Sequence, residues 1–514
     1  MSHVVIVGAG SGGGALAARL TENPDYEVTL VEAGPDFPRD EEVPDSVRYA
    51  YEMSVDEHDW GLRAYFLEPP EAREPQPYPR GRLVGGSSSV NAAMGARATA
   101  ADMRSWVDCG NTEWSYEKVL PYFRRLENDR DYGDTAEHGQ DGPVSIMRYR
   151  EDQWSDAARA FAASCIDRRF PVCEDMNAWD AVGVGSVPRN LTGDARESSL
   201  LTYLRAARGR PNLKLISDAA CRRVLFEGTR AVGVEIDLDG KVRQIAGDHI
   251  VLAAGAIHTP QLLMLSGVGP HETLDRFGIP VVCARGGVGR NFQDHPFVPL
   301  VALLSRRSDV VGARNGLRYT STLGKELGLV NDMMVIPSQF DPATMNMDID
   351  AGGRQAITLV SLLARPRSRG WVTLASADPR EAPEIHVNFL SDPADEPRLE
   401  ECVRLAHEIA TSSPFKDEID EILFPDAATV DDPVGLKAFI RGTANTAYHG
   451  SCSCRIGPSD DAAAVVDQRL SVQGVENLWI GDASVMVSVP TALTNITAYM
   501  IGERLADLLR EAMN

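Results

Sequence analysis

The chain has 514 residues, of which 43% are hydrophobic, and a formal net charge of −23. This length can bury the cores of about three domain-sized units without disulfides or metals, and the excess of acidic residues disfavours nucleic-acid binding. No run reaches the roughly 20 apolar residues of a membrane span, no signal peptide is evident, and eight irregularly spaced cysteines predict reduced thiols in the cytoplasm.

The N-terminus predicts a dinucleotide-binding unit. Residues 4–7 form a short apolar run typical of a buried parallel strand, and Gly8, Gly10 and Gly13 follow in the G-x-G-x-x-G pattern before a helix. A second strand ends at Glu32, where an acid accepts a hydrogen bond from a ribose hydroxyl. The combination of strand, loop, helix, strand and terminal acid is much more specific than the glycines alone, and the acid favours FAD or NAD over NADP.

Further motifs follow along the chain, and their order is more informative than any one of them. The second is rich in glycine and serine, which lets the backbone approach a flat ligand closely. The others comprise a buried strand that runs into a helix, an Asn-to-His run, a histidine segment and a Gly-Asp pair before the last helix. In sequence order they are residues 80–91, 250–269, 288–296, 448–457 and 479–484.

This ordered set resembles the glucose–methanol–choline (GMC) oxidoreductases, FAD-dependent enzymes that oxidise alcohols, from residue 4 to about residue 512. The resemblance implies an α/β fold, in which a Rossmann-like FAD-binding domain is interleaved with an α+β substrate domain built on an antiparallel sheet. The implied FAD-binding domain comprises residues 1–155, 195–298 and 442–514. The implied substrate-binding domain comprises residues 156–194 and 299–441.

The residues of the middle region agree with this layout. Strand-like segments at 356–364, 371–375 and 383–388 are separated by turn residues and predict one antiparallel sheet. Residues 399–410 predict a helix whose apolar face comprises Leu399, Val403, Leu405 and Ile409. Residues 305–350 lack clear periodicity and are either a lid or irregular surface.

By resemblance, a defined set of residues surrounds FAD. Some family members bond FAD covalently through a histidine just before the family asparagine, but here that position is Val90, so we expect FAD to be non-covalent. A helix that begins near Thr494 would direct its N-terminus at the flavin and stabilise negative charge there. The expected cofactor-binding residues are Gly8, Gly10, Gly13, Glu32, Gly85, Ser89, Asn91, Ala92, Val224, Asp482 and Ala483.

Among ten histidines, His449 alone occupies the position of the family's catalytic histidine. It is expected to accept, or hydrogen-bond to, the substrate hydroxyl proton as hydride leaves for flavin N5. The segment departs from the family pattern at Gly450, Cys452 and Ile456. The pair Cys452 and Cys454 is compatible with a redox or a metal site. No other cluster of ligand residues accompanies the pair in the sequence, so we expect buried thiols and no metal.

The second catalytic position, usually His or Asn in the family, corresponds to Leu493. A leucine cannot hydrogen-bond a substrate oxygen, and loss of such a donor typically costs about 10²–10³ in rate. Asn495 lies two residues further on and is the expected substitute. Tyr448 and Ser451 are alternatives.

We therefore expect an FAD-dependent alcohol oxidase or dehydrogenase that acts on CH–OH donors, yields an aldehyde or ketone, and passes electrons to O₂ or another acceptor. Leu493 keeps two alternatives open: variant GMC chemistry of the hydroxynitrile-lyase or decarboxylase type, and a binding protein with vestigial FAD. An NAD-dependent dehydrogenase fits the first loop but not the second. The expected partners are a small-molecule alcohol and an electron acceptor. Because Arg455 is the one arginine that follows His449 closely, we expect a neutral alcohol, aromatic or polyol-like.

Overall fold

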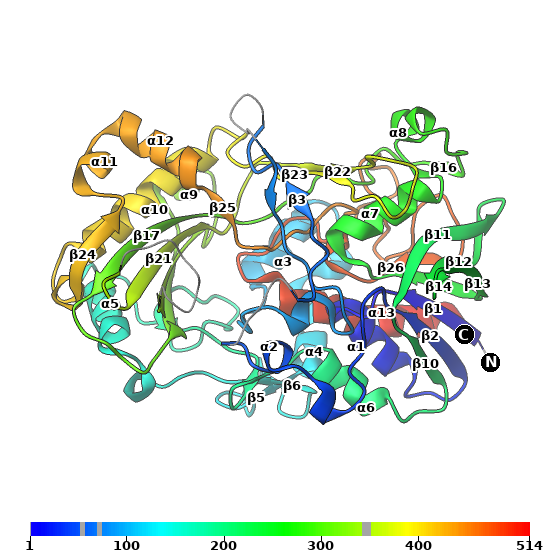
Figure 1. Cartoon of the computed structure of the whole chain (residues 1–514), viewed down its shortest axis with the longest axis horizontal. Coiled ribbons are helices and arrows are strands. Elements are labelled where there is room, and N and C mark those ends of the chain that lie inside the picture. Colours follow the sequence, from blue (N-terminus) through cyan, green and yellow to red (C-terminus); the bar gives the residue numbers. More distant parts are fainter. Residues whose placement is uncertain (1, 52–56, 69–73, 342–350, 514) are drawn as a thin grey trace.

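The computed structural model describes residues 2–51, 57–68, 74–341 and 351–513. Two lobes lie side by side along the longest axis of the molecule, and both chain termini lie on the same lobe (Figure 1). Within the described residues, no helix is both long enough and apolar enough to cross a bilayer. We call the lobe with the termini the nucleotide lobe and the other the substrate lobe.

A five-stranded parallel sheet forms the centre of the nucleotide lobe. Its order, β10-β2-β1-β14-β26, places β1 between strands that come from widely separated parts of the chain. The apolar run in β1 is fully buried because helices and loops cover both faces of such a sheet. The strands are β1 Ser2–Val7, β2 Tyr26–Val31, β10 Leu213–Ile216, β14 His249–Leu252 and β26 Leu478–Ile480.

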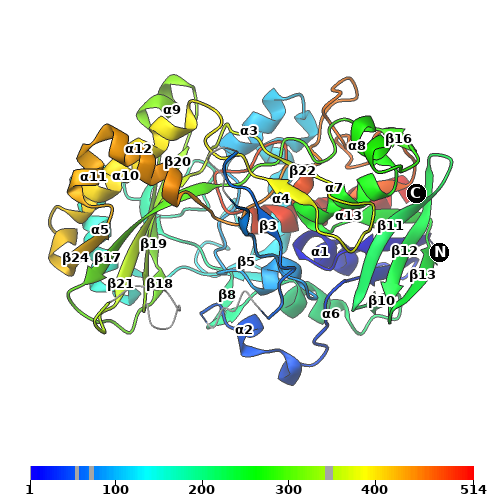
Figure 2. The same ribbon diagram turned by 45° about the horizontal axis from the view of Figure 1, so that its top comes forward.

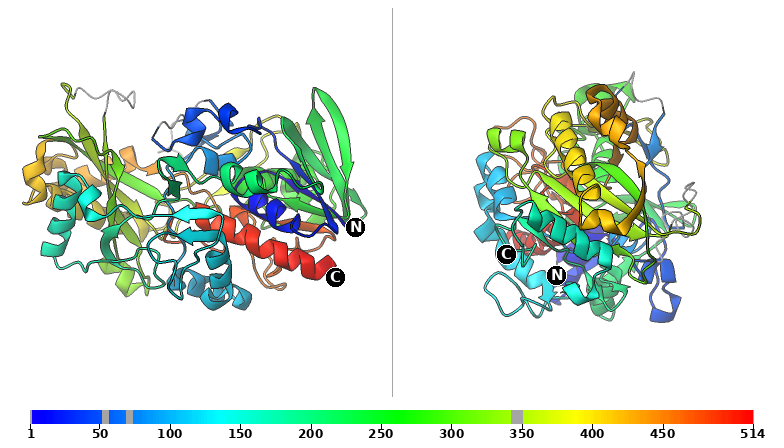
Figure 3. Two further views of the ribbon diagram at one scale, coloured as in Figure 1. Left: turned by 90° about the horizontal axis from the view of Figure 1, so that it is seen from below. Right: turned by 90° about the vertical axis from the view of Figure 1, so that its left-hand side faces the viewer.

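Two helices lie together against this sheet. Helix α1 (Ser11–Leu20) follows β1, and the last helix, α13 (Thr494–Met513), runs beside it (Figure 3). The two backbones approach so closely that a Cβ atom on Gly502 would lie 2.3 Å from the carbonyl oxygen of Gly12. A separate antiparallel sheet, β11 Ala219–Glu227, β12 Arg230–Leu238 and β13 Lys241–Ala246, extends from the same lobe.

The substrate lobe is built on an eight-stranded sheet whose pairs are antiparallel. Six strands follow the order β24-β17-β21-β20-β19-β7, while β18 pairs with β20 and β25 with β17. The strands are β7 Gly183–Ser186, β17 Pro296–Leu304, β18 Gly312–Ala313, β19 Asn315–Tyr319, β20 Met333–Phe340, β21 Ala356–Leu363, β24 Ile419–Phe424 and β25 Asn445–Thr446.

The two faces of this sheet bury different clusters. In β20, Met333 and Val335 pack with helix α10 (Asp395–Ala410), whereas Met334 and Ile336 belong to a separate apolar cluster on the other face. Helices α10 and α5 (Asp156–Asp167) lie over the first face (Figure 2). The second face is left to contact segments that come from the nucleotide lobe.

Shorter elements connect these layers. The remaining helices are α2 Asp45–Arg48, α3 Ala100–Asp108, α4 Tyr116–Leu126, α6 Arg205–Ala207, α7 Gly255–Leu265, α8 His271–Arg276, α9 Thr322–Glu326, α11 Ala427–Asp431 and α12 Pro433–Thr443. The remaining strands are β3 Arg63–Ala64, β4 Gln76–Pro77, β5 Glu127–Asp129, β6 Val144–Ile146, β8 Leu191–Thr192, β9 Ala195–Arg196, β15 Val268–Gly269, β16 Cys283–Ala284, β22 Trp371–Thr373 and β23 Glu384–His386.

Two predictions about the middle region were wrong. Strands β22 and β23 form a sheet separate from β21. The other side of β23 is occupied by the segment at Tyr65, whose backbone bonds to Ile385 and Val387, and Trp371 and Tyr65 both stack on His386. Most of residues 305–341 is ordered as β18, β19, α9 and β20 rather than as a lid or irregular surface. Residues 342–350 of that prediction lie outside the described residues.

The structure orders the helix predicted at 399–410 as the longer α10. Leu399, Val403 and Ile409 are buried as expected, whereas Leu405 is only partly buried and Cys402 is packed in the core. The exact division of the chain into domains remains a prediction, and β25 at 445–446 pairs with β17 although it belongs to the predicted FAD-binding segment 442–514.

Candidate active site

The first glycine loop has the backbone geometry that a dinucleotide site needs. Gly8 has φ +103°, and a Cβ atom there would lie 2.3 Å from the carbonyl oxygen of Ala253, so only glycine fits between β1 and β14. A Cβ on Gly13 would lie 2.0 Å from the Gly8 carbonyl oxygen. The N-terminus of α1 therefore opens at the carboxyl end of β1, where strand order reverses and ligands bind in open α/β sheets.

Glu32 lies at the end of β2 and fastens this loop. Its carboxylate accepts hydrogen bonds from the backbone of Ala9 at 2.9 Å and of Gly34 at 3.0 Å. Burial raises the pKa of Glu32 to about 7 despite these bonds. The predicted ribose acceptor thus has two backbone partners in place and the environment of a buried site.

The second glycine loop touches the first. Gly85 has φ +98°, and a Cβ atom on Gly86 would lie 2.9 Å from the Cα of Gly10. Ser89 is fully buried and donates to the carbonyl oxygen of Val84 at 3.3 Å. The two loops that sequence reasoning assigned to one cofactor are therefore in contact.

Two buried arginines hold the end of the second loop. Arg196 donates from Nε to the carbonyl oxygen of Asn91 at 2.8 Å, and Arg189 donates from Nη2 to that of Ala92 at 2.6 Å. The Asn91 side chain accepts from the backbone of Ala93 at 2.9 Å. The two arginines thereby fix the backbone of the loop through its carbonyl groups.

Asp482 connects the C-terminal segment to the nucleotide sheet. Its carboxylate accepts from the backbone of Gly255 at 2.9 Å and from the Thr259 hydroxyl at 2.6 Å, and burial raises its pKa. The carbonyl of Ala483 accepts from the backbone of Cys452 at 3.1 Å. Asp482 and Ala483 therefore join the cofactor loops to the histidine segment.

Val224, the residue expected beside adenine, is buried in β11. Its backbone N–H donates to the Ser266 hydroxyl at 2.8 Å, which connects β11 to the end of α7. This contact positions the strand but does not by itself identify a ligand.

Several buried polar atoms near these loops have no partner in the described part of the chain. Ser11 at the start of α1 donates to the Asn495 side-chain oxygen at 2.7 Å, while the Asn495 amide nitrogen is buried and unpartnered. Ser484 and Thr497 carry unpartnered hydroxyls. Buried polar groups are normally hydrogen-bonded, so these atoms, together with the two helix N-termini and the glycine loops, fit a large polar cofactor such as FAD.

His449 forms a buried pair with His295. Their Nδ1 atoms lie 2.9 Å apart and their rings meet edge to face. Burial, with the nearby charge of Arg80, lowers the pKa of His449 to about 3. Burial, with His449 itself, lowers the pKa of His295 to about 3. Both rings are therefore neutral, and one Nδ1 donates while the other accepts.

Asp294 fixes the backbone on both sides of this pair. Its Oδ1 accepts from the backbone N–H groups of His295 and His449, each at 2.7 Å. Its Oδ2 accepts from the hydroxyls of Tyr78 and Thr446. Sequence reasoning assigned no role to Asp294 or His295, although the consecutive Asp, His and Pro at 294–296 were a usable signal.

The departure at Gly450 has a steric explanation. A Cβ atom there would lie 2.7 Å from the Tyr78 hydroxyl and 2.8 Å from the Phe292 ring. Arg80 donates from Nη1 to the carbonyl oxygen of Tyr448 at 2.7 Å, and its Nη2 is buried without a partner in the described residues. Arg455, the arginine that sequence reasoning placed beside His449, is paired with Asp461 at 2.6 Å. Arg80 is therefore the cation beside His449.

The catalytic role expected of Asn495 remains a prediction, and the contact of its side chain in the structure is with Ser11 rather than with His449. The oxygen of Asn495 is held by Ser11, as described above, and the bonded partner of His449 is His295. Leu493 is half-buried just before α13. Neither Asn495 nor Leu493 supplies the contact that orients the His449 ring.

Cys452 and Cys454 are fully buried free thiols, as are two other cysteines. Burial raises the pKa of Cys452 to about 12, so it is a thiol rather than a metal-binding thiolate at neutral pH.

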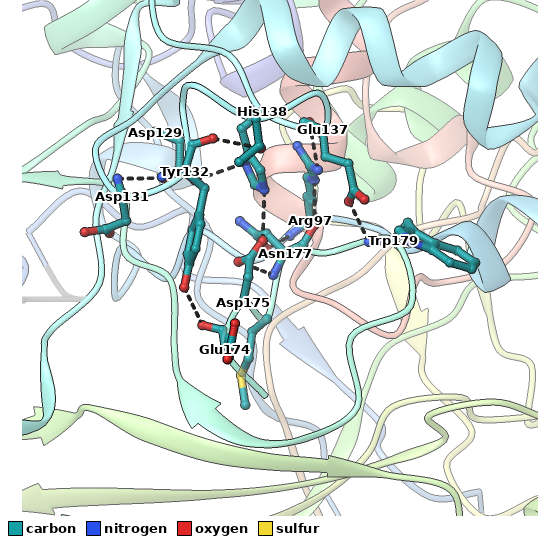
Figure 4. Close-up of polar contacts among 12 residues, drawn as sticks. Arg97, Asp129, Asp131, Tyr132, Glu137, His138, Glu174, Asp175, Asn177 and Trp179 are labelled. Carbon is teal, nitrogen blue, oxygen red and sulfur yellow. Dashed lines mark hydrogen bonds and ion pairs between the residues drawn. The ribbon is translucent and has the colours of Figure 1, made fainter. Parts of the chain in front are cut away.

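One cluster does bring potential metal ligands together: Glu127, Asp129 and His138, all buried. The His138 Nδ1 lies 3.1 Å from both carboxylates, and its Nε2 lies 2.9 Å from Asp175 (Figure 4). Arg97 and Arg148 also pair with these acids, so three carboxylates meet three cations. The carboxylates raise the pKa of His138 to about 10, and an imidazolium cannot bind a metal.

Comparison with known proteins agrees with the geometry. Family models described as GMC oxidoreductase match residues 6–297 and 366–502. The chain is 35% identical to mouse mitochondrial choline dehydrogenase, with 98% of this chain and 89% of that protein aligned, and 34% identical to 5-(hydroxymethyl)furfural oxidase from Methylovorus sp., with 98% of each aligned. The crystal structure of pyridoxine 4-oxidase from Mesorbium loti superposes with a TM-score of 0.90 at 26% identity, covering 99% of both chains.

Proposed function

The chain belongs to the GMC oxidoreductase family, and we propose that it oxidises an alcohol to an aldehyde or ketone with His449 as the base. As a member of this family it is an FAD-binding enzyme that acts on CH–OH donors. The observation that carries the assignment of the base is the neutral, buried His449–His295 pair beside the cofactor loops.

Bound FAD supplies a hydride acceptor, and the residues of this chain handle the proton. His449 can accept the hydroxyl proton on Nε2 only if its own ring proton is on Nδ1. In that tautomer the Nδ1–H group of His449 donates a hydrogen bond to Nδ1 of His295 across the 2.9 Å contact. With His295 as the acceptor of this bond, His449 has the tautomer of a base, and Asp294 supports this positioning role by fixing both backbones.

We infer that FAD is held without a covalent bond. Val90 occupies the linkage position and has no nucleophilic atom. The glycine loops, Glu32, the Asn495 amide and the N-terminus of α1 are the groups that would hold the cofactor. Acid precipitation of the purified yellow protein should leave FAD in the supernatant, and FAD that stays with the precipitated chain would contradict the inference.

A screen of alcohols tests the proposed reaction. The FAD-loaded protein is mixed with primary and secondary alcohols without oxygen, and the visible absorption of the flavin is followed. Bleaching by at least one alcohol is expected. Absence of bleaching with every alcohol, in protein that binds FAD fully, would favour the lyase or decarboxylase alternatives that Leu493 keeps open.

The electron acceptor is assayed with the active alcohol. Peroxide formed under air at the rate of alcohol loss identifies an oxidase, while turnover that requires an artificial dye identifies a dehydrogenase. Relatives of both kinds exist, because one of those named above is a choline dehydrogenase and another is an oxidase.

A further inference from the structure

Four side chains gather where the second glycine loop meets the substrate sheet: Arg189, Arg314, Tyr51 and Tyr149. The two tyrosine hydroxyls lie 3.1 Å apart. The guanidinium of Arg314 lies 3.7 Å from the centre of the Tyr149 ring, and both arginines lie 5.8 Å from the centre of the Tyr51 ring. We call this group the arginine–tyrosine cluster.

The two arginines of the cluster have no counter-ion. Arg189 is 2% exposed, and its Nη groups donate only to the backbone carbonyls of Ala92 and Ala313, while its Nε has no partner. The Nε and Nη1 of Arg314 are also buried and unpartnered. Among the residues that the structure describes, neither guanidinium forms an ion pair.

Buried arginines elsewhere in the described part of this chain are of two kinds: Arg97, Arg148 and Arg398 are paired with acids, whereas Arg196, Arg318 and Arg504 form no ion pair. Arg97 lies 2.8 Å from Glu127, Arg148 lies 2.8 Å from Asp129, and Arg398 lies 3.1 Å from Asp332. Arginine is rarely buried without a partner because removing its charge from water is costly. Burial and the neighbouring charge of Arg314 lower the pKa of Arg189. What distinguishes the cluster is that the buried Arg189 and the half-buried Arg314 lie against the same Tyr51 ring with no acid paired to either, and this arrangement points to a place for an anion.

The cluster borders the same surface as the proposed base. The Ala313 carbonyl that binds Arg189 belongs to a residue in the apolar cluster of Met334, Ile336, Leu362 and Ala364. Ala447, two residues before His449, packs against that apolar cluster. The Ala92 carbonyl that binds Arg189 belongs to the loop expected beside the flavin.

FAD phosphates are not the missing anion in this arrangement. The expected place for these phosphates is the first glycine loop with the N-terminus of α1, and neither Arg189 nor Arg314 contacts that loop in the described structure. The anion is therefore a second ligand. A guanidinium presents N–H groups in a planar fork that matches a carboxylate or a phosphate, and the two phenol hydroxyls add further donors.

We propose that the arginine–tyrosine cluster binds an anionic group of the substrate, so that the enzyme prefers alcohols that carry a carboxylate or phosphate. This proposal rests on the alcohol oxidation proposed above. It replaces the neutral alcohol expected from the sequence, where Arg189 and Arg314 are more than 100 residues from His449 and gave no sign of sharing a region with it.

The test compares two alcohols that differ in one charge: 4-(hydroxymethyl)benzoate and its amide. Their kcat/KM values are measured by anaerobic flavin reduction in the wild type and in Arg314→Gln. The wild type should prefer the carboxylate by about tenfold or more, the range of a charged hydrogen bond, and Arg314→Gln should remove that preference while the amide changes by less than about threefold. Equal kcat/KM for both compounds in the wild type would overturn the proposal.

Two further variants separate charge from folding. Arg314→Lys keeps the positive charge and should retain a preference for the carboxylate. Arg150→Gln removes one positive charge from an exposed side chain next to Tyr149 in sequence and should leave the preference unchanged. Loss of preference in Arg150→Gln would mean that overall charge, not the cluster, selects the substrate.

Binding gives a readout that does not depend on turnover. Calorimetry with the FAD-loaded protein compares benzoate, phenyl phosphate and benzamide, which lack the alcohol. Benzoate or phenyl phosphate should bind and weaken about tenfold in Arg314→Gln, with the tighter of the two identifying the anion. If no alcohol bleaches the flavin but these anions bind as expected, only the proposed function fails. If neutral alcohols bleach it and the anions do not bind, only this proposal fails.

Discussion

At the scale of single residues, the proposed base His449 is paired with a second histidine, His295. His449 stands out in the sequence because it lies in a recognisable motif, but its partner His295 lies more than 150 residues earlier and is brought to it by an antiparallel contact between Gln293 and Ser451. No local pattern encodes that contact. The catalytic motif was therefore predictable from the sequence and its hydrogen-bond partner was not.

Substitutions at His295 test its positioning role. Gln can still accept a hydrogen bond from Nδ1 of His449, whereas Leu cannot. We expect His295→Gln to retain most of the rate of flavin reduction and His295→Leu to lose about 10²-fold, in line with the loss of proton-transfer assistance.

The pH profile distinguishes this role from a merely structural one. Because burial lowers the pKa of His449 to about 3, its neutral form is present at all pH values above that. The kcat/KM of the wild type should therefore stay level as pH falls below 6.5. An acid limb with an apparent pKa at or above 6.5, or an identical loss in both His295 variants, would contradict the account.

At the scale of helices and strands, the sequence did not show which charged side chains would be buried. The predicted last helix is observed as α13. On its apolar face Ile501 and Leu505 are buried and Leu508 is partly buried. The charged Glu503 is also fully buried, because Arg19 and Arg125 pair with it at 2.9 Å and 2.6 Å. Periodicity locates a helix and its apolar stripe, but it does not show which charged residues find partners in other elements.

The His138 network connects β5 to the segment between α5 and β7, where Asp175 lies (Figure 4). Its folded-state pKa of about 10 is above the ordinary value of 6.5. The network therefore contributes its full stability below pH 6.5, and that contribution is lost as pH rises through about 10.

Unfolding of the FAD-loaded protein by urea at several pH values measures this contribution. His138→Gln should lower the free energy of unfolding by about 3–5 kcal/mol at pH 6.5, because it removes one of the three cations that face three buried carboxylates, and the gap from the wild type should shrink toward pH 10. His271→Gln, at an exposed histidine paired with Asp275, is the matched control and should change little. A gap that is constant with pH would rule out a charged His138.

At the scale of the whole molecule, the glycine motifs predicted more of the architecture than composition did. They placed FAD-binding segments at both ends and in the middle of the chain, and β1, β14 and β26 do meet in one sheet. The substrate sheet was harder to predict because its strands β7, β19 and β20 are contributed by regions with mixed Gly, Arg and Met, and β22 and β23 share the strand pattern but pack against β3. The cytoplasmic location and the exact domain boundaries remain predictions.

The arginine–tyrosine cluster, which we propose as an anion site, could not be seen in the sequence for a reason at the same scale. Tyr51, Tyr149, Arg189 and Arg314 come from four separate segments, and only the fold brings them beside the cofactor loops. The neutral alcohol expected from the sequence rested on Arg455 alone, the one arginine that follows His449 closely, and not on the net charge of −23. Net charge describes the surface, whereas substrate selection depends on the few charges that are buried.

The central claim is that His449 takes the alcohol proton during flavin reduction. The most direct measurement mixes the FAD-loaded His449→Gln variant with an alcohol that bleaches the wild-type flavin, without oxygen, and follows the rate of bleaching. We expect the rate constant of His449→Gln to be about 10²–10⁴-fold below that of the wild type, with FAD still fully bound. Bleaching at the wild-type rate would contradict it.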